Sequence, residues 1–137
     1  MRILALDQSS QVTGWAIFQD GKLDKFGKFD HKNSNVIARI SSLKADVLQL
    51  IEDESIDKVI LEEIQMQGNI NNVATFKVLA FVLGALEILM YELDMPYETL
   101  PSSTWKSICG VKGRARAEQK KDARYSRCNL YRPCGDA

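Results

Sequence analysis

The sequence has few of the residues that bind transition metals or form disulfides. It contains one histidine, His31, and three cysteines, Cys109, Cys128 and Cys134, with no CxxC spacing. A structural zinc site needs four nitrogen or sulfur ligands at short spacings, so the composition indicates none. Three thiols in this arrangement are most simply explained as reduced cysteines of an intracellular protein.

Long apolar segments are also missing. The longest apolar run, residues 78–86, is far shorter than the roughly 20 residues that a membrane-spanning helix needs. The apolar run at the N-terminus is short and leads directly into Asp7, which is not the pattern of a signal peptide. No repeat or linker divides the 137 residues, so we expect a soluble, cytoplasmic, single-domain protein with a substantial core.

Net charge is formally zero, but the charges are unevenly distributed. Residues 1–101 contain 9 Lys and Arg against 15 Asp and Glu, a net charge of −6, and residues 102–137 contain 9 against 3, a net charge of +6. A basic C-terminal quarter on an acidic body suggests a partner rich in phosphate. A solvated basic surface would give the same pattern.

An acidic residue ends the first predicted strand, residues 2–7. Side chains alternate between the faces of a strand, so Ile3, Ala5 and Asp7 share one face. A carboxylate at the end of a buried strand costs free energy unless a metal ion, a helix N-terminus or backbone amides satisfy it. Alone, Asp7 is equally compatible with a residue that merely caps the turn.

Three short strands and a helix make up the first half of the predicted chain. Strands at 2–7, 13–19 and 22–29 are joined by short connections, with Asp-Gly as the signal for the second turn, and form an antiparallel meander. A helix begins near Ser34, capped by Asn33 or Ser34. Its apolar residues recur at helical spacing, while Arg39, Lys44 and Glu52 lie off that stripe.

A fourth predicted strand, residues 57–63, is again apolar and ends in acid at Glu62 and Glu63. It follows a helical crossover, which returns the chain parallel to an earlier strand. If the first strand is its neighbour, Asp7 and Glu62 lie at the same edge of the sheet. Ligands of open α/β sheets bind beyond this edge.

The second half begins with a long predicted helix at 69–94, apolar on nearly all sides between 78 and 90. Such a helix must be covered on both faces, so we expect a homodimer through this helix, although flanking segments could also cover it. A short strand at 96–100 and a brief helix ending at Gly110 follow.

A basic segment with glycines, residues 110–116, is suited to follow a phosphate backbone through Lys112, Arg114 and Arg116. Residues 117–125 could begin a last helix. Residues 124–137 show neither a helical nor a strand period.

This order of elements is similar to the RNase H-like fold, an α/β fold with a five-stranded mixed sheet flanked by helices. Its motifs resemble those of the RuvC-type Holliday-junction resolvases, including small phage-encoded ones. The family opens with an apolar strand, an Asp and Thr-Gly-Trp in the next strand, and later has an apolar strand ending in a metal-binding Glu. The matching segments here are 3–7, 13–15, 60–66, 103–106 and 116–121, so the resemblance covers roughly residues 1–123.

The resemblance implies a bacterial or phage-encoded, Mg²⁺-dependent endonuclease that resolves Holliday junctions or other branched DNA as a homodimer, with Mn²⁺ able to substitute. Asp7 and Glu62 would hold the metal, and Lys106 and Lys120 would stabilise phosphate charge. The implied DNA contacts are Lys112, Arg114, Arg116, Lys121, Gln65 and Met66.

Two departures from the family pattern affect the predicted site. Gln65, beside Met66, stands where the family has a base-contacting aromatic residue. The acidic pair that ends the family's last helix would fall just past Ala137, and Asp136, the candidate third metal ligand, lies too early and follows Gly135. Residues 124–137 are therefore expected to be a truncated or altered tail on a single domain at 1–123, and cleavage by this chain to be impaired.

Two other functions remain open on the sequence. A non-cleaving protein of the same fold could bind branched DNA with a defective metal site. Half of an actin-like or sugar-kinase-like ATPase would also open with strand, Asp, turn and strand. That ATPase needs glycine-rich phosphate loops, and the turn Gln8-Ser9-Ser10 has no glycine.

Overall fold

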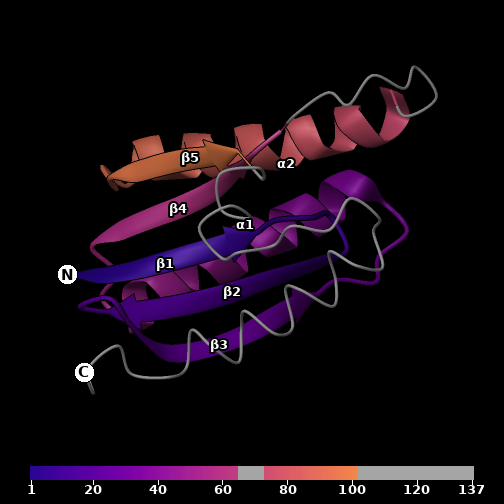
Figure 1. Ribbon diagram of the computed structural model, residues 1–137. Helices are drawn as coiled ribbons and strands as arrows, with labels where there is room; N and C mark the ends of the chain where they lie inside the picture. The colour runs from indigo at the N-terminus through magenta and orange to yellow at the C-terminus, as the bar shows by residue number, and fades with distance from the viewer. Residues whose placement is uncertain (65–72, 102–137) are drawn as a thin grey trace, which may run out of the picture. The chain divides into compact units, whose positions relative to one another are not determined.

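The computed structural model describes residues 1–64 and 73–101. The chain divides into two compact units, Met1–Thr99 and Leu100–Ala137. The described elements belong to the first unit, except that the last strand runs to Pro101. In chain order they are β1 (Arg2–Asp7), β2 (Val12–Gln19), β3 (Lys22–Asp30), α1 (Val36–Asp53), β4 (Lys58–Glu63), α2 (Val73–Glu92) and β5 (Tyr97–Pro101) (Figure 1).

The five strands form one mixed sheet in the order β3-β2-β1-β4-β5. β1 pairs antiparallel with β2, and β2 with β3, which confirms the predicted meander. β1 pairs in parallel with β4, in a register that runs from Ile3 opposite Lys58 to Ala5 opposite Ile60. The predicted parallel return beside the first strand is therefore confirmed.

The turn between β2 and β3 explains the Asp-Gly pair in the sequence. Asp20 and Gly21 both have positive φ, 51° and 79°. A two-residue hairpin turn whose twist matches the strands requires positive φ at both central positions, and Asp followed by Gly tolerates it.

The predicted helix after residue 101 lies outside the described residues.

Helix α1 departs from the sequence prediction in two ways. The N-cap is Asn35, whose side chain accepts a hydrogen bond from the Ala38 amide at 3.1 Å, and not Asn33 or Ser34. Asn33 instead accepts a hydrogen bond from the Asn35 amide through its own side chain. Arg39, predicted to lie off the apolar stripe, is only 8 % exposed, because backbone carbonyls of neighbouring loops surround its guanidinium group.

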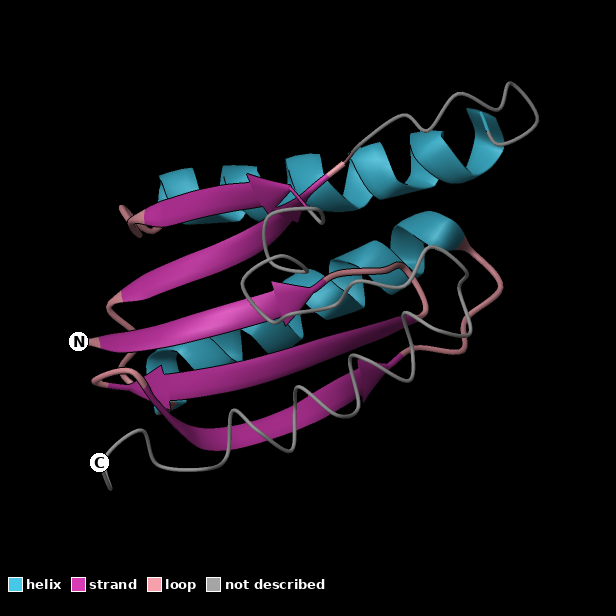
Figure 2. Ribbon diagram, viewed as in Figure 1, coloured by secondary structure: helices cyan, strands magenta, loops and turns pink. Residues whose placement is uncertain are grey.

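The core lies between one face of the sheet and both helices, which lie behind the strands in Figure 2. Alternation decides which strand residues enter it: Leu4 and Leu6 of β1 are buried, as are Val59 and Leu61 of β4. The helices contribute most of the other large buried side chains, among them Leu43, Val47, Leu83, Leu86, Leu89 and Met90. Ile3, Ala5 and Asp7 therefore point to the opposite face.

Helix α2 is apolar over most of its surface, as predicted, and only part of that surface is buried. Five of its residues are buried: Val82, Leu83, Leu86, Leu89 and Met90. By length and composition alone α2 could cross a membrane. Its uninterrupted apolar run, residues 78–86, is shorter than the roughly 20 residues of a membrane span. Core helices of soluble proteins meet the same criterion, and α2 packs against α1 and adds its buried residues to the core of this sheet.

Candidate metal and nucleic-acid site

The candidate site is the edge of the sheet where β1 and β4 both end, and Figure 1 shows their arrowheads at this edge. Asp7 is the last residue of β1 and is exposed. Gly14 lies opposite Asp7 in the antiparallel ladder. A Cβ added to Gly14 would lie 3.8 Å from the Asp7 Cβ, so the absence of a side chain there leaves the space beside Asp7 open.

Glu62 occupies the corresponding position near the end of β4. Continuing the β1–β4 register by two residues from Ala5 and Ile60 places Asp7 level with Glu62. Both alternate with buried leucines, so both lie on the face of the sheet away from the helices. The Glu62 side chain is half-buried. The next residue, Glu63, accepts a hydrogen bond from the Ile64 amide through its side chain at 3.2 Å.

Gln8 connects the two strand ends. Its side-chain Nε2 donates to the Glu62 carbonyl at 2.6 Å, and its Oε1 accepts from the Glu62 amide at 3.0 Å. Gln8 is only 8 % exposed. The sequence suggests only a turn residue at position 8, so the contact between the Gln8 side chain and the Glu62 backbone was not predicted.

The turn after Asp7 is held by hydrogen bonds from several elements. The buried Thr13 donates its hydroxyl to the Ser9 carbonyl at 2.9 Å and accepts from the Ser9 amide at 3.1 Å. Arg39 of α1 donates through Nε to the Ser10 carbonyl at 3.1 Å. The His31 amide donates to the Gln11 carbonyl at 2.8 Å. The backbone that leaves Asp7 is thus fixed from β2, from α1 and from the segment after β3.

The Thr-Gly-Trp motif has a structural role at each position. Thr13 closes the turn, and Gly14 lies opposite Asp7. The Trp15 ring packs against Phe29 with a centroid distance of 6.1 Å and covers Gly27, where an added Cβ would lie 2.6 Å from a ring carbon. The motif therefore shapes the strand next to the candidate site.

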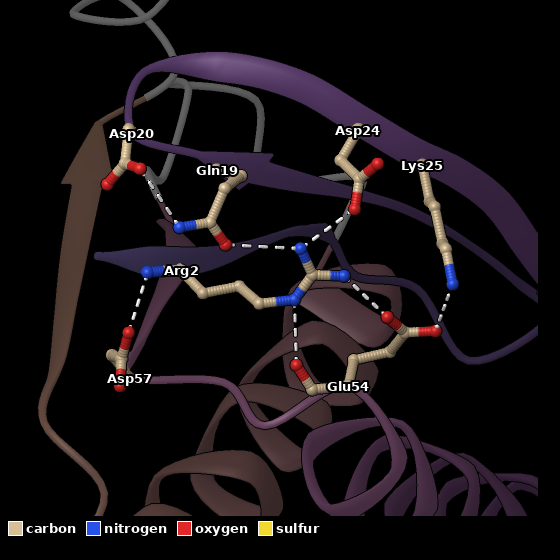
Figure 3. Close-up of polar contacts among 7 residues, drawn as sticks. All are labelled: Arg2, Gln19, Asp20, Asp24, Lys25, Glu54 and Asp57. Atoms are coloured by element: carbon tan, nitrogen blue, oxygen red, sulfur yellow. Dashed lines mark hydrogen bonds and ion pairs between the residues drawn. The ribbon is translucent and has the colours of Figure 1, made fainter.

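A second polar cluster lies at the opposite end of β1, around Arg2 (Figure 3). Its guanidinium group bonds Asp24 at 2.8 Å and both the carboxylate and the carbonyl of Glu54. Lys25 donates to Glu54 at 2.8 Å. The hydrogen bonds from Lys25 and then from Arg2 hold the pKa of the Glu54 carboxyl below its ordinary value of 4.5. This cluster joins the start of β1 to the end of α1 and is remote in the strand from Asp7.

All the other predicted site residues lie outside the described residues. These are Gln65, Met66, Lys106, Lys112, Arg114, Arg116, Lys120, Lys121 and Asp136. Within residues 1–64 and 73–101, no three or more His, Cys, Asp or Glu side chains are grouped so that they could hold a metal ion. Asp7 and Glu62 are carboxylates, the hard oxygen donors that suit Mg²⁺ or Mn²⁺. The described part of the site thus offers two ligands of the type that Mg²⁺ or Mn²⁺ prefers.

Comparison with known proteins gives structural matches only. No family model and no curated protein matches the sequence. The structure is similar to RuvC of Thermus thermophilus, with a TM-score of 0.72, 16 % identity and coverage of 100 % of this chain and 84 % of RuvC.

Two complexes with DNA give further matches. A T. thermophilus RuvC in complex with a Holliday junction substrate matches with a TM-score of 0.65, 19 % identity and coverage of 79 % and 69 %. The fowlpox virus resolvase with its Holliday junction matches with a TM-score of 0.57, 17 % identity and coverage of 88 % and 69 %. At these identities the similarity shows the fold, and the chain has the RNase H-like fold of RuvC.

Proposed function

We propose that the chain is a divalent-metal-dependent endonuclease that resolves Holliday junctions or related branched DNA. The observation that carries the proposal is the arrangement of Asp7 and Glu62, the last residue of β1 and the last but one of the adjacent β4, on one face of the sheet. Two of the similar structures contain a resolvase bound to a Holliday junction. The resemblance of the motifs around Asp7 and Glu62 to the same family supports this assignment.

In this proposal Asp7 and Glu62 hold Mg²⁺, which Mn²⁺ can replace. The metal would stabilise negative charge on the phosphodiester during hydrolysis, a contribution typically of several kcal/mol to the barrier. Lys106 and Lys120 would add positive charge at the phosphate. Lys112, Arg114, Arg116 and Lys121 would contact the backbone, and Gln65 and Met66 would face unstacked bases.

A second candidate function is binding of branched DNA without cleavage. It is favoured by the donor set, because the described residues offer two carboxylates at the site and no group of three. A site short of ligands would hold its second metal ion weakly, and each 1.4 kcal/mol lost from transition-state stabilisation slows cleavage about tenfold. This alternative predicts that the chain binds junctions and cleaves them slowly or not at all.

The test is Mn²⁺ binding measured by calorimetry, together with binding and cleavage of a four-way junction. Asp7→Asn should abolish metal binding, and the control Asp53→Asn, which changes an exposed carboxylate on α1, should leave it unchanged. Equal Mn²⁺ binding by the wild type and by Asp7→Asn would refute the metal assignment. Rapid symmetrical cleavage would reject the non-cleaving alternative, and no preference for junctions over linear duplex would reject both functions.

The proposed dimer would form through one exposed stripe of α2. The stripe consists of Lys77, Phe81, Gly84, Ile88 and Tyr91. Their spacings alternate between four and three residues, as do the spacings of the contact positions in paired helices. Phe81, Ile88 and Tyr91 are 45 %, 57 % and 85 % exposed. Apart from the chain neighbours of Gly84 and the backbone of its own helix, the described residues place no heavy atom within 4 Å of a Cβ added there, so a second helix could approach closely.

A further inference from the structure

The Gln8 side chain takes the place of a peptide group between β1 and β4. The amide of a glutamine has the same donor and acceptor as a peptide, and here both bond one residue: Nε2 to the Glu62 carbonyl at 2.6 Å and Oε1 to the Glu62 amide at 3.0 Å. The paired residues of the two strands end at Ala5 and Ile60. Gln8 therefore ties the strands together beyond the end of their ladder.

The position of this contact matters because of its neighbours. Gln8 follows Asp7 directly, and its bonds go to the backbone of Glu62 itself. The backbone on the other side of Gln8 is fixed as well, since Ser9 is bonded to Thr13 and Ser10 to Arg39. Movement of the Glu62 backbone relative to Asp7 would therefore break hydrogen bonds that are partly buried.

We infer that Gln8 is a positioning residue that sets the placement of Glu62 relative to Asp7, and thereby the affinity of the site for a divalent cation. The inference rests on the proposed function. Side chains that orient metal ligands without touching the metal typically change metal affinity 10- to 100-fold when they are replaced. Gln8→Met retains the length and bulk of the side chain and removes both hydrogen bonds.

Two measurements test the inference separately. The first is hydrogen exchange of the Glu62 amide followed by NMR in the absence of metal, which reports the contact itself. We expect exchange at least about fivefold faster in Gln8→Met, because the lost hydrogen bond contributes about 1 kcal/mol or more and each 1.4 kcal/mol corresponds to a factor of about ten. The second is the Kd for Mn²⁺, which we expect to rise about 10- to 100-fold.

Two controls separate positioning from general stability. Gln11→Met makes the same change at an exposed residue of the same turn and should alter neither measurement. Val47→Ala removes buried volume from α1, which supplies no ligand to the proposed site. It should lower the stability of the fold and leave the Kd for Mn²⁺ within about twofold of the wild type. If Gln8→Met does not fold, Gln8→Asn, whose shorter amide cannot make both bonds, replaces it in both measurements.

Each result decides one statement. Unchanged Glu62 exchange in Gln8→Met would show that the contact does not hold the strand end, and would overturn the inference. Faster exchange with unchanged Mn²⁺ affinity would make Gln8 a structural residue only, and would also overturn it. Absence of Mn²⁺ binding in the wild type, or binding that Asp7→Asn does not weaken, would refute the proposed function instead, whatever the exchange measurement gives.

Discussion

Replacing the buried Arg39 of α1 tests how the turn after Asp7 is held. Its guanidinium group donates to the Ser10 carbonyl at 3.1 Å, to the Asn33 carbonyl at 2.7 Å and more weakly to the Ser10 hydroxyl at 3.4 Å. Arg39 as a whole is 8 % exposed. No carboxylate within 4.0 Å pairs with it among the described residues, so its partners are the loops before α1 and after β1.

The expected effect of Arg39→Met is the difference between two opposing terms. Each of the two shorter hydrogen bonds from a charged donor contributes about 1.5–3 kcal/mol, so together they contribute about 3–6 kcal/mol. Methionine no longer requires burial of a charge, whose desolvation costs several kcal/mol, but it leaves the Ser10 and Asn33 carbonyls without their partner. We expect a net loss of about 2 kcal/mol in the free energy of unfolding, which for a chain of this length lowers Tm by about 6–10 °C.

The assay is urea and thermal unfolding followed by circular dichroism. Arg39→Lys retains the charge but has one ammonium group in place of the planar fork, so its stability should fall between those of the wild type and Arg39→Met. Lys44→Met on the same helix removes a surface amine 3.9 Å from Glu92 and should change the free energy of unfolding by less than about 0.5 kcal/mol. An Arg39→Met variant as stable as Lys44→Met would refute the reasoning.

Two further predictions concern other parts of the molecule. The wild type should scatter light as a dimer of the 15.4-kDa chain, and Phe81→Glu should give monomers while Ile37→Glu, at an exposed residue of α1, should not; a monomeric wild type would contradict the dimer. Because the folded-state pKa of Glu54 is lowered, its ion pairs stabilise the fold above pH 4.5 and this contribution is lost as the pH falls through the lowered value. The free energy of unfolding, measured in urea between pH 3 and 7, should fall with pH in the wild type and in the control Glu52→Gln. It should fall less in Glu54→Gln. The same dependence on pH in all three proteins would contradict this prediction.

The elements that could be predicted from the sequence are those with strong local signals. β1 has the predicted bounds and β2 begins one residue earlier than predicted, because alternation and the Asp-Gly turn are encoded within a few residues. The parallel pairing of β4 with β1 follows from the helix between them. The end of β1 at Asp7 and the parallel pairing of β4 with β1 were sufficient to predict that Asp7 and Glu62 lie at one edge of the sheet.

The residues that were misplaced depend on geometry that residue type and periodicity do not show. Asn33, Ser34 and Asn35 can each cap a helix, and only the geometry selects Asn35, which reaches the Ala38 amide. Helical periodicity places Arg39 off the apolar stripe, but its guanidinium group bonds the Asn33 carbonyl just before the helix and the Ser10 carbonyl, which lies 29 residues away. Gln8 is the same case, because its partner is 54 residues away.

The register of β1 against β4 is fixed at both ends, and the site depends on it. At the start of β1, the Arg2 amide donates to the Asp57 carboxylate at 2.7 Å, and the Asp57 amide donates to the Arg2 carbonyl at 2.8 Å. At the end of β1, the Gln8 side chain bonds both backbone groups of Glu62. A slip of one residue would turn Asp7 toward the helices and separate it from Glu62. The two side chains that close this strand pair, one acidic and one amide, thus hold the candidate ligands on the same face of the sheet.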